Sequence, residues 1–265
     1  MPHRSVAQSH QNYRHTFSQL WENYNLIEFY APLIMKQISK GILPLPKLSS
    51  IFGPERTLTA SVAANSFKSM SDRHNGYVYF VYLISSFEQC ISDAVYITYT
   101  AKPELIDPNL DQTSVPAQDT KILKMILESS DYKEIIDKVV EERIRGIFYG
   151  NPMDIFEKDK CRMKIGSWFK DNAETELQVL REAILRRNLI VHNNGRVDRR
   201  YLRETGLNWP LGKKLDIDKT YMKQAISVVI NISGCFSALI VRQIFQEKPI
   251  GWLGEKLKRY ERKAP

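Results

Sequence analysis

The sequence is poor in cysteine, and its cysteines are not spaced as metal ligands or as a disulfide framework. There are three, Cys90, Cys161 and Cys235, and no two of them form a Cys-x-x-Cys pair. Structural zinc sites use closely spaced cysteines and histidines, and small secreted domains carry a dense, even set of cysteines. We therefore expect free thiols, no bound metal, and a cytoplasmic protein in a reducing compartment.

A continuous apolar run of membrane-spanning length is also missing. A transmembrane helix needs about 20 consecutive apolar residues, but residues 77–100 are interrupted by Glu88 and Asp93, and residues 225–241 are too short. Residues 1–17 contain no apolar core of a signal peptide. Both apolar segments are predicted to be buried core helices, and no membrane is expected among the partners.

Sustained alternation of apolar and polar residues, the pattern of a half-buried strand, is the third absence. Apolar residues instead recur at three- and four-residue spacing, which predicts amphipathic helices. The predicted helices cover residues 6–39, 57–70, 77–100, 120–128, 132–148, 153–158, 172–192 and 219–246. A pair of short extended pieces is compatible with the sequence near Val197 and over 213–217. The chain is therefore predicted to be all-α, a bundle of long helices with an additional N-terminal helical segment.

Length and turn residues indicate the domain organisation. The 265 residues are enough for a sizeable core, and they show no internal repeat. The strongest break is the Pro-, Ser- and Gly-rich stretch 41–54. We predict an N-terminal helical extension over 1–70, a main helical domain over 71–248, and a basic, frayed C-terminal tail over 249–265.

Basic residues outnumber acidic ones, 38 to 30, which gives a formal net charge of +8. Such a charge favours a polyanionic partner without identifying it. Arginines gather in one region: Arg181, Arg186, Arg187, Arg196, Arg199, Arg200 and Arg203. One interpretation is that these arginines follow an RNA backbone. A solvated face is the alternative, and it is at least as well supported for the last three.

The most informative stretch, RRNLIVHNNGRVDRRYL, covers residues 186–202. The helix over 172–192, with Asn172 as its N-cap, is predicted to stop at Asn193-Asn194-Gly195, because Asn and Gly accept the left-handed conformation that ends helices. His192 then lies on the final turn, where its imidazole is exposed at the helix end. Arginine binds phosphate through a planar fork of donors, and histidine exchanges protons near neutral pH.

These residue types suit RNA cleavage without a metal. Internal cleavage needs a base for the 2′-hydroxyl, a positive group for the charge on phosphorus, and an acid for the leaving 5′-oxygen. The products are a 2′,3′-cyclic phosphate and a 5′-hydroxyl. A single copy offers one proton-transfer group, His192. The chemistry therefore predicts a symmetric homodimer with the two motif helices at the interface.

The segment from Arg187 to His192 resembles the Arg-x-x-x-x-His signature of the HEPN superfamily, all-α ribonucleases of toxin and phage-defence systems. Asn188 matches a residue type common after the arginine. The sequences 82–95 around Glu88 and 142–157 are also similar, so the resemblance covers about 77–246. It implies a HEPN-like helical bundle and an endoribonuclease without a cofactor. It further implies a toxin or abortive-infection effector, with RNA as substrate and an antitoxin or regulatory protein as a further partner.

The resemblance also implies roles for the residues of the motif. Arg187 binds the scissile phosphate, His192 transfers protons, and Asn188 supports the geometry of the substrate or of the dimer. Arg186 and Arg196 are expected to contact RNA. HEPN members silenced by a partner nucleotidyltransferase carry a tyrosine two residues after the histidine, and Asn194 stands there, so tyrosine adenylylation is not expected.

Two supporting positions have open alternatives. Glu88 lies on an apolar helix, where an unpaired carboxylate is costly. It is expected to pair with Arg187 or to orient His192. The alternatives are a structural ion pair with another arginine and a polar edge shared with Ser92 and Asp93. Asn193 is expected to act as a helix cap, and its amide is also placed to contact a phosphate.

The principal motif residues have structural alternatives too. His192 can simply interact with the helix dipole. Arg187 can be a surface residue that pairs with Glu182 or Glu176. In that case nothing in the sequence distinguishes its role from that of Arg186. Tyr201 suits packing better than base stacking. The alternative function is a non-catalytic RNA-binding or scaffolding HEPN module, and a third is a purely structural α-helical interaction protein.

Overall fold

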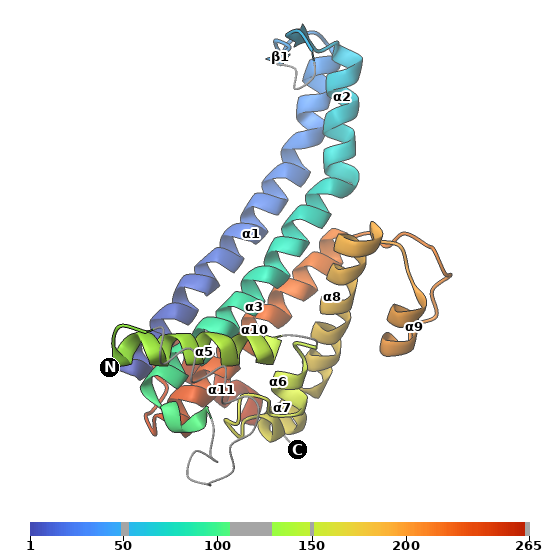
Figure 1. Cartoon of the computed structure of the whole chain (residues 1–265). Coiled ribbons are helices and arrows are strands. Elements are labelled where there is room, and N and C mark those ends of the chain that lie inside the picture. The colour runs from blue at the N-terminus through green and yellow to red at the C-terminus, as the bar shows by residue number, and fades with distance from the viewer. Residues whose placement is uncertain (49–52, 107–128, 149–150, 263–265) are drawn as a thin grey trace. The chain divides into compact units, whose positions relative to one another are not determined.

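The structure is a computed structural model, and it describes residues 1–48, 53–106, 129–148 and 151–262. The fold is all-α, as the sequence predicts (Figure 1). A two-stranded antiparallel sheet joins β1 (Lys47–Leu48) to β2 (Arg56–Thr57), with Lys47 opposite Thr57. The helices are α1 (Pro2–Ser39), α2 (Ala60–Ser69), α3 (Asn75–Ala101), α5 (Tyr132–Phe148), α6 (Asp154–Glu157), α7 (Gly166–Asn172), α8 (Glu174–Asn193), α9 (Arg199–Thr205), α10 (Lys219–Leu239) and α11 (Gly251–Glu261).

Most predicted helices are present, with bounds that differ by a few residues. The helix predicted over 120–128 lies outside the described residues. The prediction that Asn172 caps α8 is wrong. Asn172 is the last residue of α7, and its amide donates to the carbonyl of Trp168 at 2.9 Å. A second short helix therefore ends directly before α8, which a capping pattern alone does not reveal.

The chain divides into two compact units. Unit 1 contains Met1–Arg14, Ser85–Arg181 and Val228–Pro265, and unit 2 contains His15–Ile84 and Glu182–Ser227. This division differs from the sequence-based boundaries at 70/71 and 248/249. Each unit combines segments that are distant in sequence, because long helices contribute one part to each unit and turn signals do not mark such a division.

An aromatic cluster forms the core of unit 1. The ring of Phe156 packs edge-on against Phe169 and Phe236, with ring centroids 5.0 and 5.8 Å apart. The three cysteines are free and buried in the same unit. The sequence therefore predicted the thiols correctly. Burial and the charge of Asp159 outweigh the opposing effect of Arg143 and raise the pKa of Cys161 to about 12, so this thiol stays protonated.

The C-terminal region corrects another prediction. Residues expected to fray form α11, because Leu253, Leu257 and Tyr260 recur at helical spacing and all three are buried. The hydroxyl of Tyr260 donates to Glu176 at 2.9 Å. The segment is rich in basic residues and has only a narrow apolar stripe. Its composition therefore predicts a frayed tail, although the segment forms a packed helix.

Helix α1 contributes a buried histidine to unit 1. The ring of His10 stacks on Trp252 at 5.3 Å, and Gly234 lies so close to Trp252 that a β-carbon there would overlap its ring. Burial, and then the charge of Arg14, lowers the pKa of His10 to about 4. The imidazole is therefore neutral at physiological pH.

In unit 2, α1 and α3 pack side by side and α2 lies between β2 and α3 along the chain (Figure 1). Asn75, at the start of α3, donates to the carboxylate of Glu28 at 2.9 Å. The ring of Tyr24 packs edge-on against Tyr79 at 6.5 Å. These contacts fix α3 against the C-terminal half of α1.

One helix among the described residues, Lys219–Ile244, is long and apolar enough to cross a membrane by length and composition. In its most apolar window, 78% of the residues are buried inside the protein. Buried core helices pass the same test, and this burial agrees with the core position predicted for residues 225–241.

Candidate functional site

Helix α8 ends as its sequence predicts. Its last residue is Asn193, and the next two, Asn194 and Gly195, have left-handed φ angles of 51° and 73°. The backbone N–H of Gly195 donates to the carbonyl of Leu189 at 2.9 Å, the closing hydrogen bond of a helix C-terminal motif. Asn194 and Gly195 therefore end the helix one residue after His192.

Gly195 also permits a close approach to α3. A β-carbon at this position would overlap the phenol of Tyr77. The Tyr77 hydroxyl donates to the carbonyl of Leu215 at 2.6 Å, and the N–H of Leu215 donates to the carbonyl of Gly195 at 2.9 Å. Burial raises the pKa of Tyr77, so its hydroxyl remains a donor. The end of α8 is thereby held against α3.

The segment after Gly195 contains the two short extended pieces that the sequence indicates. Arg196 forms an antiparallel bridge with Lys214, and the N–H of Val197 donates to the carbonyl of Lys213 at 2.9 Å. Asp198 then caps α9 by accepting from the N–H of Tyr201 at 2.8 Å. These local bonds bring α9 beside the last turns of α8.

A pocket of about 140 Å³ lies between these elements in unit 2. His192 and Asn193 are exposed, and Asn188 is half-buried. Asn188 and His192 are one helical turn apart and share a face of α8. The lining residues are Leu185, Asn188, Leu189, His192, Asn193, Asp198, Arg200 and Tyr201.

Arg187 is not among the lining residues of this pocket. Five positions separate it from His192, which places the two side chains about 140° apart around the helix. Arg187 is half-buried on its own side of α8. Within one chain, the structure therefore brings together Asn188, His192 and Asn193 and leaves Arg187 on another face.

The guanidinium that does line the pocket belongs to Arg200, for which the sequence supports a solvated position at least as well as an RNA contact. Its side chain is exposed on α9, and its Nε lies 2.8 Å from Glu204 Oε1. Only the fold of the segment after Gly195 brings α9 to α8. The local signals of this helix are Asp198, which caps its start, and Gly206, which ends it in the left-handed conformation with a φ of 69°.

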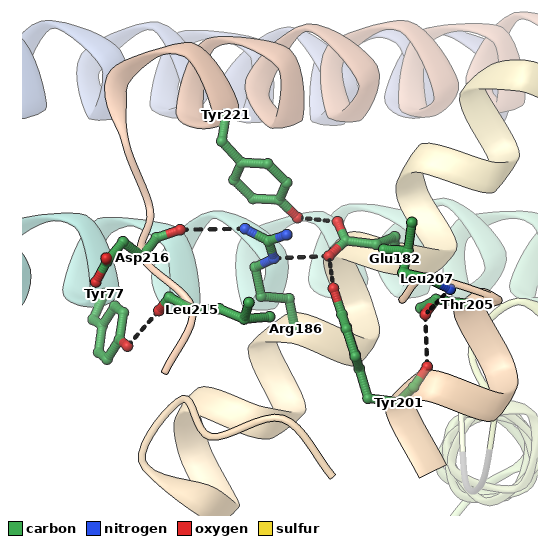
Figure 2. Close-up of polar contacts among 9 residues, drawn as sticks. All are labelled: Tyr77, Glu182, Arg186, Tyr201, Thr205, Leu207, Leu215, Asp216 and Tyr221. Atoms are coloured by element: carbon green, nitrogen blue, oxygen red, sulfur yellow. Dashed lines mark hydrogen bonds and ion pairs between the residues drawn. The ribbon is translucent and has the colours of Figure 1, made fainter. Parts of the chain in front are cut away.

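Next to the pocket lies a buried polar network centred on Glu182 and Arg186 (Figure 2). Arg186 Nε donates to Glu182 Oε1 at 2.7 Å, and Nη1 donates to the carbonyl of Asp216 at 3.2 Å. The guanidinium also stacks on the ring of Tyr221 at 3.8 Å. The hydroxyls of Tyr201 and Tyr221 both donate to Glu182.

This network gives Arg186 structural contacts within the chain. Only 8% of the residue is exposed, and its guanidinium is committed to Glu182 and Tyr221, so its position does not support the RNA contact expected from the sequence. Burial opposes its charge, but Tyr221 and Glu182 outweigh burial and raise its pKa. The local sequence does not distinguish the roles of the adjacent Arg186 and Arg187. The two residues differ in how deeply the fold buries them.

Tyr201 packs rather than presenting its ring to solvent, as the spacing analysis favoured. It belongs to a buried apolar cluster with Leu185, Leu189, Val197 and Leu215. Burial, followed by the charge of Glu182, raises its pKa. Its hydroxyl therefore stays a donor to Glu182, and its ring forms a fixed wall of the pocket.

Residues 196–214, which supply part of the pocket, carry more basic than acidic side chains. Lys214, half-buried, has a lowered pKa because of burial and then because of the charges of Arg73 and Arg196. The Nη1 atom of Arg196 donates to the carbonyl of Gly212 at 3.3 Å. Exposed cationic side chains in this part of unit 2 are Arg196, Arg199, Arg200, Arg203 and Lys213. Their combined charge attracts an anion.

The two supporting residues have different outcomes. The amide of Asn193 donates to the carbonyl of Arg196 at 2.7 Å, which agrees with the capping role expected for it. Glu88 is half-buried on α3 in unit 1, whereas Arg187 and His192 belong to unit 2. Its pairing with either residue stays a prediction.

Among the residues that the structure describes, no group of three or more His, Cys, Asp or Glu side chains is arranged to hold a metal ion. Comparisons with protein-family models, curated proteins and solved structures found no match to this chain.

Proposed function

We propose that this protein is a metal-independent endoribonuclease of the HEPN type that cleaves RNA by attack of the 2′-hydroxyl. The observation that carries the proposal is the position of His192, which is exposed on the last turn of α8 and lines a pocket with Asn188. A proton-transfer group must reach a bound strand, and an imidazole at a helix end beside a pocket meets that requirement.

The pocket is small compared with the roughly 300–1,000 Å³ of pockets that enclose drug-sized ligands. A volume of about 140 Å³ suits one group of a larger ligand. We assign it to a phosphate or a base edge of a strand whose remaining phosphates lie along the exposed arginines. Asn188 holds the bound group, and Arg200 adds positive charge from the facing helix α9.

Arg187 stabilises the transition-state charge on phosphorus in this proposal. It diverges from His192 by about 140° around α8. A second copy therefore supplies the missing groups: a second imidazole as the acid or base, and a guanidinium that approaches from the facing side. The active species is a homodimer in which the two α8 C-terminal ends converge.

The test uses the full-length protein and a fluorescent RNA in buffer with EDTA. We expect cleavage with 2′,3′-cyclic phosphate ends, and no cleavage of the matching all-deoxy strand. His192→Ala should reduce the rate by about 10²–10⁴-fold, the usual contribution of a general acid or base. The matched control is His15→Ala, which removes another exposed histidine of unit 2. Full activity in His192→Ala overturns the proposal.

A second candidate function is RNA binding without cleavage. The exposed cationic residues around the pocket favour it, because they attract a polyanion whether or not His192 reacts. Salt-sensitive binding of intact RNA by the wild type would support this function. Absence of both binding and cleavage would leave an α-helical interaction protein. For a toxin or abortive-infection effector, expression should arrest growth, and Arg187→Ala should relieve the arrest.

A further inference from the structure

The C-terminal half of α1 carries large apolar side chains that the described part of the chain leaves uncovered. In two turns of this helix, Leu26, Phe29, Tyr30 and Leu33 are 52%, 65%, 51% and 48% exposed. Single exposed apolar residues are ordinary, but a contiguous group on one helix marks a surface that binds something. The same helix buries Tyr24, Ala31 and Ile38 on its other side, so the exposed group is not the face that packs on the core.

The spacing of this surface identifies the shape of its partner. Residues 22, 26, 29, 33, 36 and 40 follow one another at alternating intervals of four and three. At 3.6 residues per turn they fall within an arc of about 80°. Tyr30 lies about 40° beyond one edge of this arc and flanks it. The alternating three- and four-residue spacing is that of a seam that receives a second helix. We call residues 22–40 on this face the α1 stripe.

The charges at the two ends of the α1 stripe identify the partner itself. Glu22 lies at the N-terminal end, and Lys36 and Lys40 lie at the C-terminal end; all three are exposed. The middle of the apolar part falls between Phe29 and Tyr30, and Glu22 and Lys36 lie about seven residues on either side of it. An antiparallel copy therefore sets Glu22 against Lys36, with the apolar side chains opposite one another.

We propose that the α1 stripe binds the α1 stripe of a second copy of this chain in antiparallel orientation. A parallel pair would set Glu22 against Glu22 and Lys36 against Lys36, which is repulsive at both ends. Glu28 is not part of the contact, because it accepts from Asn75 within the chain. This interface is separate from the α8 ends invoked for catalysis, and it stands whether or not the protein cleaves RNA.

The size of the stripe sets the strength of the association. From residue 22 to residue 40 the helix is about 27 Å long. A standard interface buries about 800 Å² per partner, and a single helix seam provides less. The association is therefore reversible and depends on protein concentration.

The first experiment measures self-association of the full chain by sedimentation velocity over a range of concentrations, without RNA. Phe29→Asp places a charge at the centre of the stripe and should weaken association at least tenfold. The matched control is Ile250→Asp, at a residue of unit 1 that is 79% exposed. It should leave association unchanged. Because both side chains are exposed, circular dichroism should show the wild-type helix content in both variants.

The second experiment reverses charges at the two ends. Glu22→Lys and Lys36→Glu should each weaken self-association, because each variant meets like charges in its antiparallel partner. An equimolar mixture of the two variants should associate again. In the mixed pair, positions 22 and 36 are both lysine in one chain and both glutamate in the other, so opposite charges meet at each end. A folding defect would not be rescued by mixing.

Three results would overturn the proposal. The first is a wild type that stays monomeric at all concentrations, and the second is association equally strong in Phe29→Asp. The third is a mixture of charge variants no stronger than either alone. Wild-type binding to phosphatidylcholine vesicles that Phe29→Asp abolishes, in a chain that does not self-associate, would assign the stripe to a lipid surface instead.

Discussion

Gly195 packs directly against Tyr77, so that a β-carbon at position 195 would overlap the phenol. The glycine ends α8 in the left-handed conformation, and the tyrosine hydroxyl bonds to Leu215 across the same junction. One small residue thus sets both where the histidine-bearing helix stops and how closely it approaches α3.

Gly195→Ala should therefore destabilise unit 2 in two ways. The left-handed φ of 73° costs an L-residue about 1 kcal/mol, and displacing the Tyr77 phenol adds a comparable amount. Urea denaturation should show a loss of about 2 kcal/mol. The control is Gly212→Ala, which has a φ of 78° but open space around its β-carbon, and should lose about 1 kcal/mol. Equal losses would show that the contact with Tyr77 contributes nothing.

Removal of Arg186 should be among the most destabilising single changes in unit 2. Arg186→Ala leaves Glu182 largely buried without its cation, and breaking such a pair costs about 3–5 kcal/mol. Arg186→Lys should recover only part of the loss, because lysine lacks the planar group that stacks on Tyr221. Arg200→Ala, which breaks the exposed pair with Glu204, should cost less than about 1 kcal/mol. Comparable losses in guanidinium chloride for Arg186→Ala and Arg200→Ala would refute the importance of burial.

The buried His10 should make stability depend on pH in acid. Its pKa falls to about 4 in the folded protein, against about 6.5 when unfolded, so the unfolded chain binds the extra proton between these values. The contribution of His10 to the free energy of unfolding is fully present above pH 6.5. It declines by up to about 3 kcal/mol as the pH falls toward 4. In the wild type, denaturation should give a lower free energy of unfolding at about pH 4.5 than at about pH 7, and in His10→Gln this difference should be smaller. An unchanged difference would contradict the prediction.

The salt dependence of RNA affinity should report how many phosphates the exposed cations contact. Each contact with a single strand adds about 0.7 to the slope of log affinity against log salt. Arg200→Ala should lower that slope by about this amount, whereas the same substitution at Lys170, an exposed cation of unit 1, should not. Fluorescence anisotropy from about 50 to about 300 mM salt measures the slope. Identical slopes for both variants would place the RNA elsewhere.

Features that depend on neighbours in sequence were predictable. The spacing of Ile135, Val139 and Val140 indicated α5 with its observed bounds. The Asn-Gly pair after His192 indicated the end of α8, because the left-handed conformation is a property of those residues. Asp218, directly before α10, is another such local feature: its carboxylate accepts from the N–H of Tyr221 at 2.7 Å.

Features that depend on packing between distant segments could not be predicted from the sequence. Arg186 and Arg187 are adjacent and of the same residue type. Arg186 is buried because it lies on the side of α8 that faces Tyr221, whereas Arg187 is only half-buried. Asn188 was expected to support the site, but its place in the pocket depends on α9 reaching α8 through the segment that Tyr77 holds. A single local pattern carries no information about which other helix will face it.

The sequence by itself determined the helical class, the end of α8 and the exposure of His192 on its last turn, because periodicity and left-handed residues act over a few positions. Tertiary structure decided which arginine is buried, that Arg200 joins the pocket, and that the C-terminal segment is a packed helix. These outcomes depend on which surfaces exclude water from one another, and that is settled only when segments far apart in the chain meet.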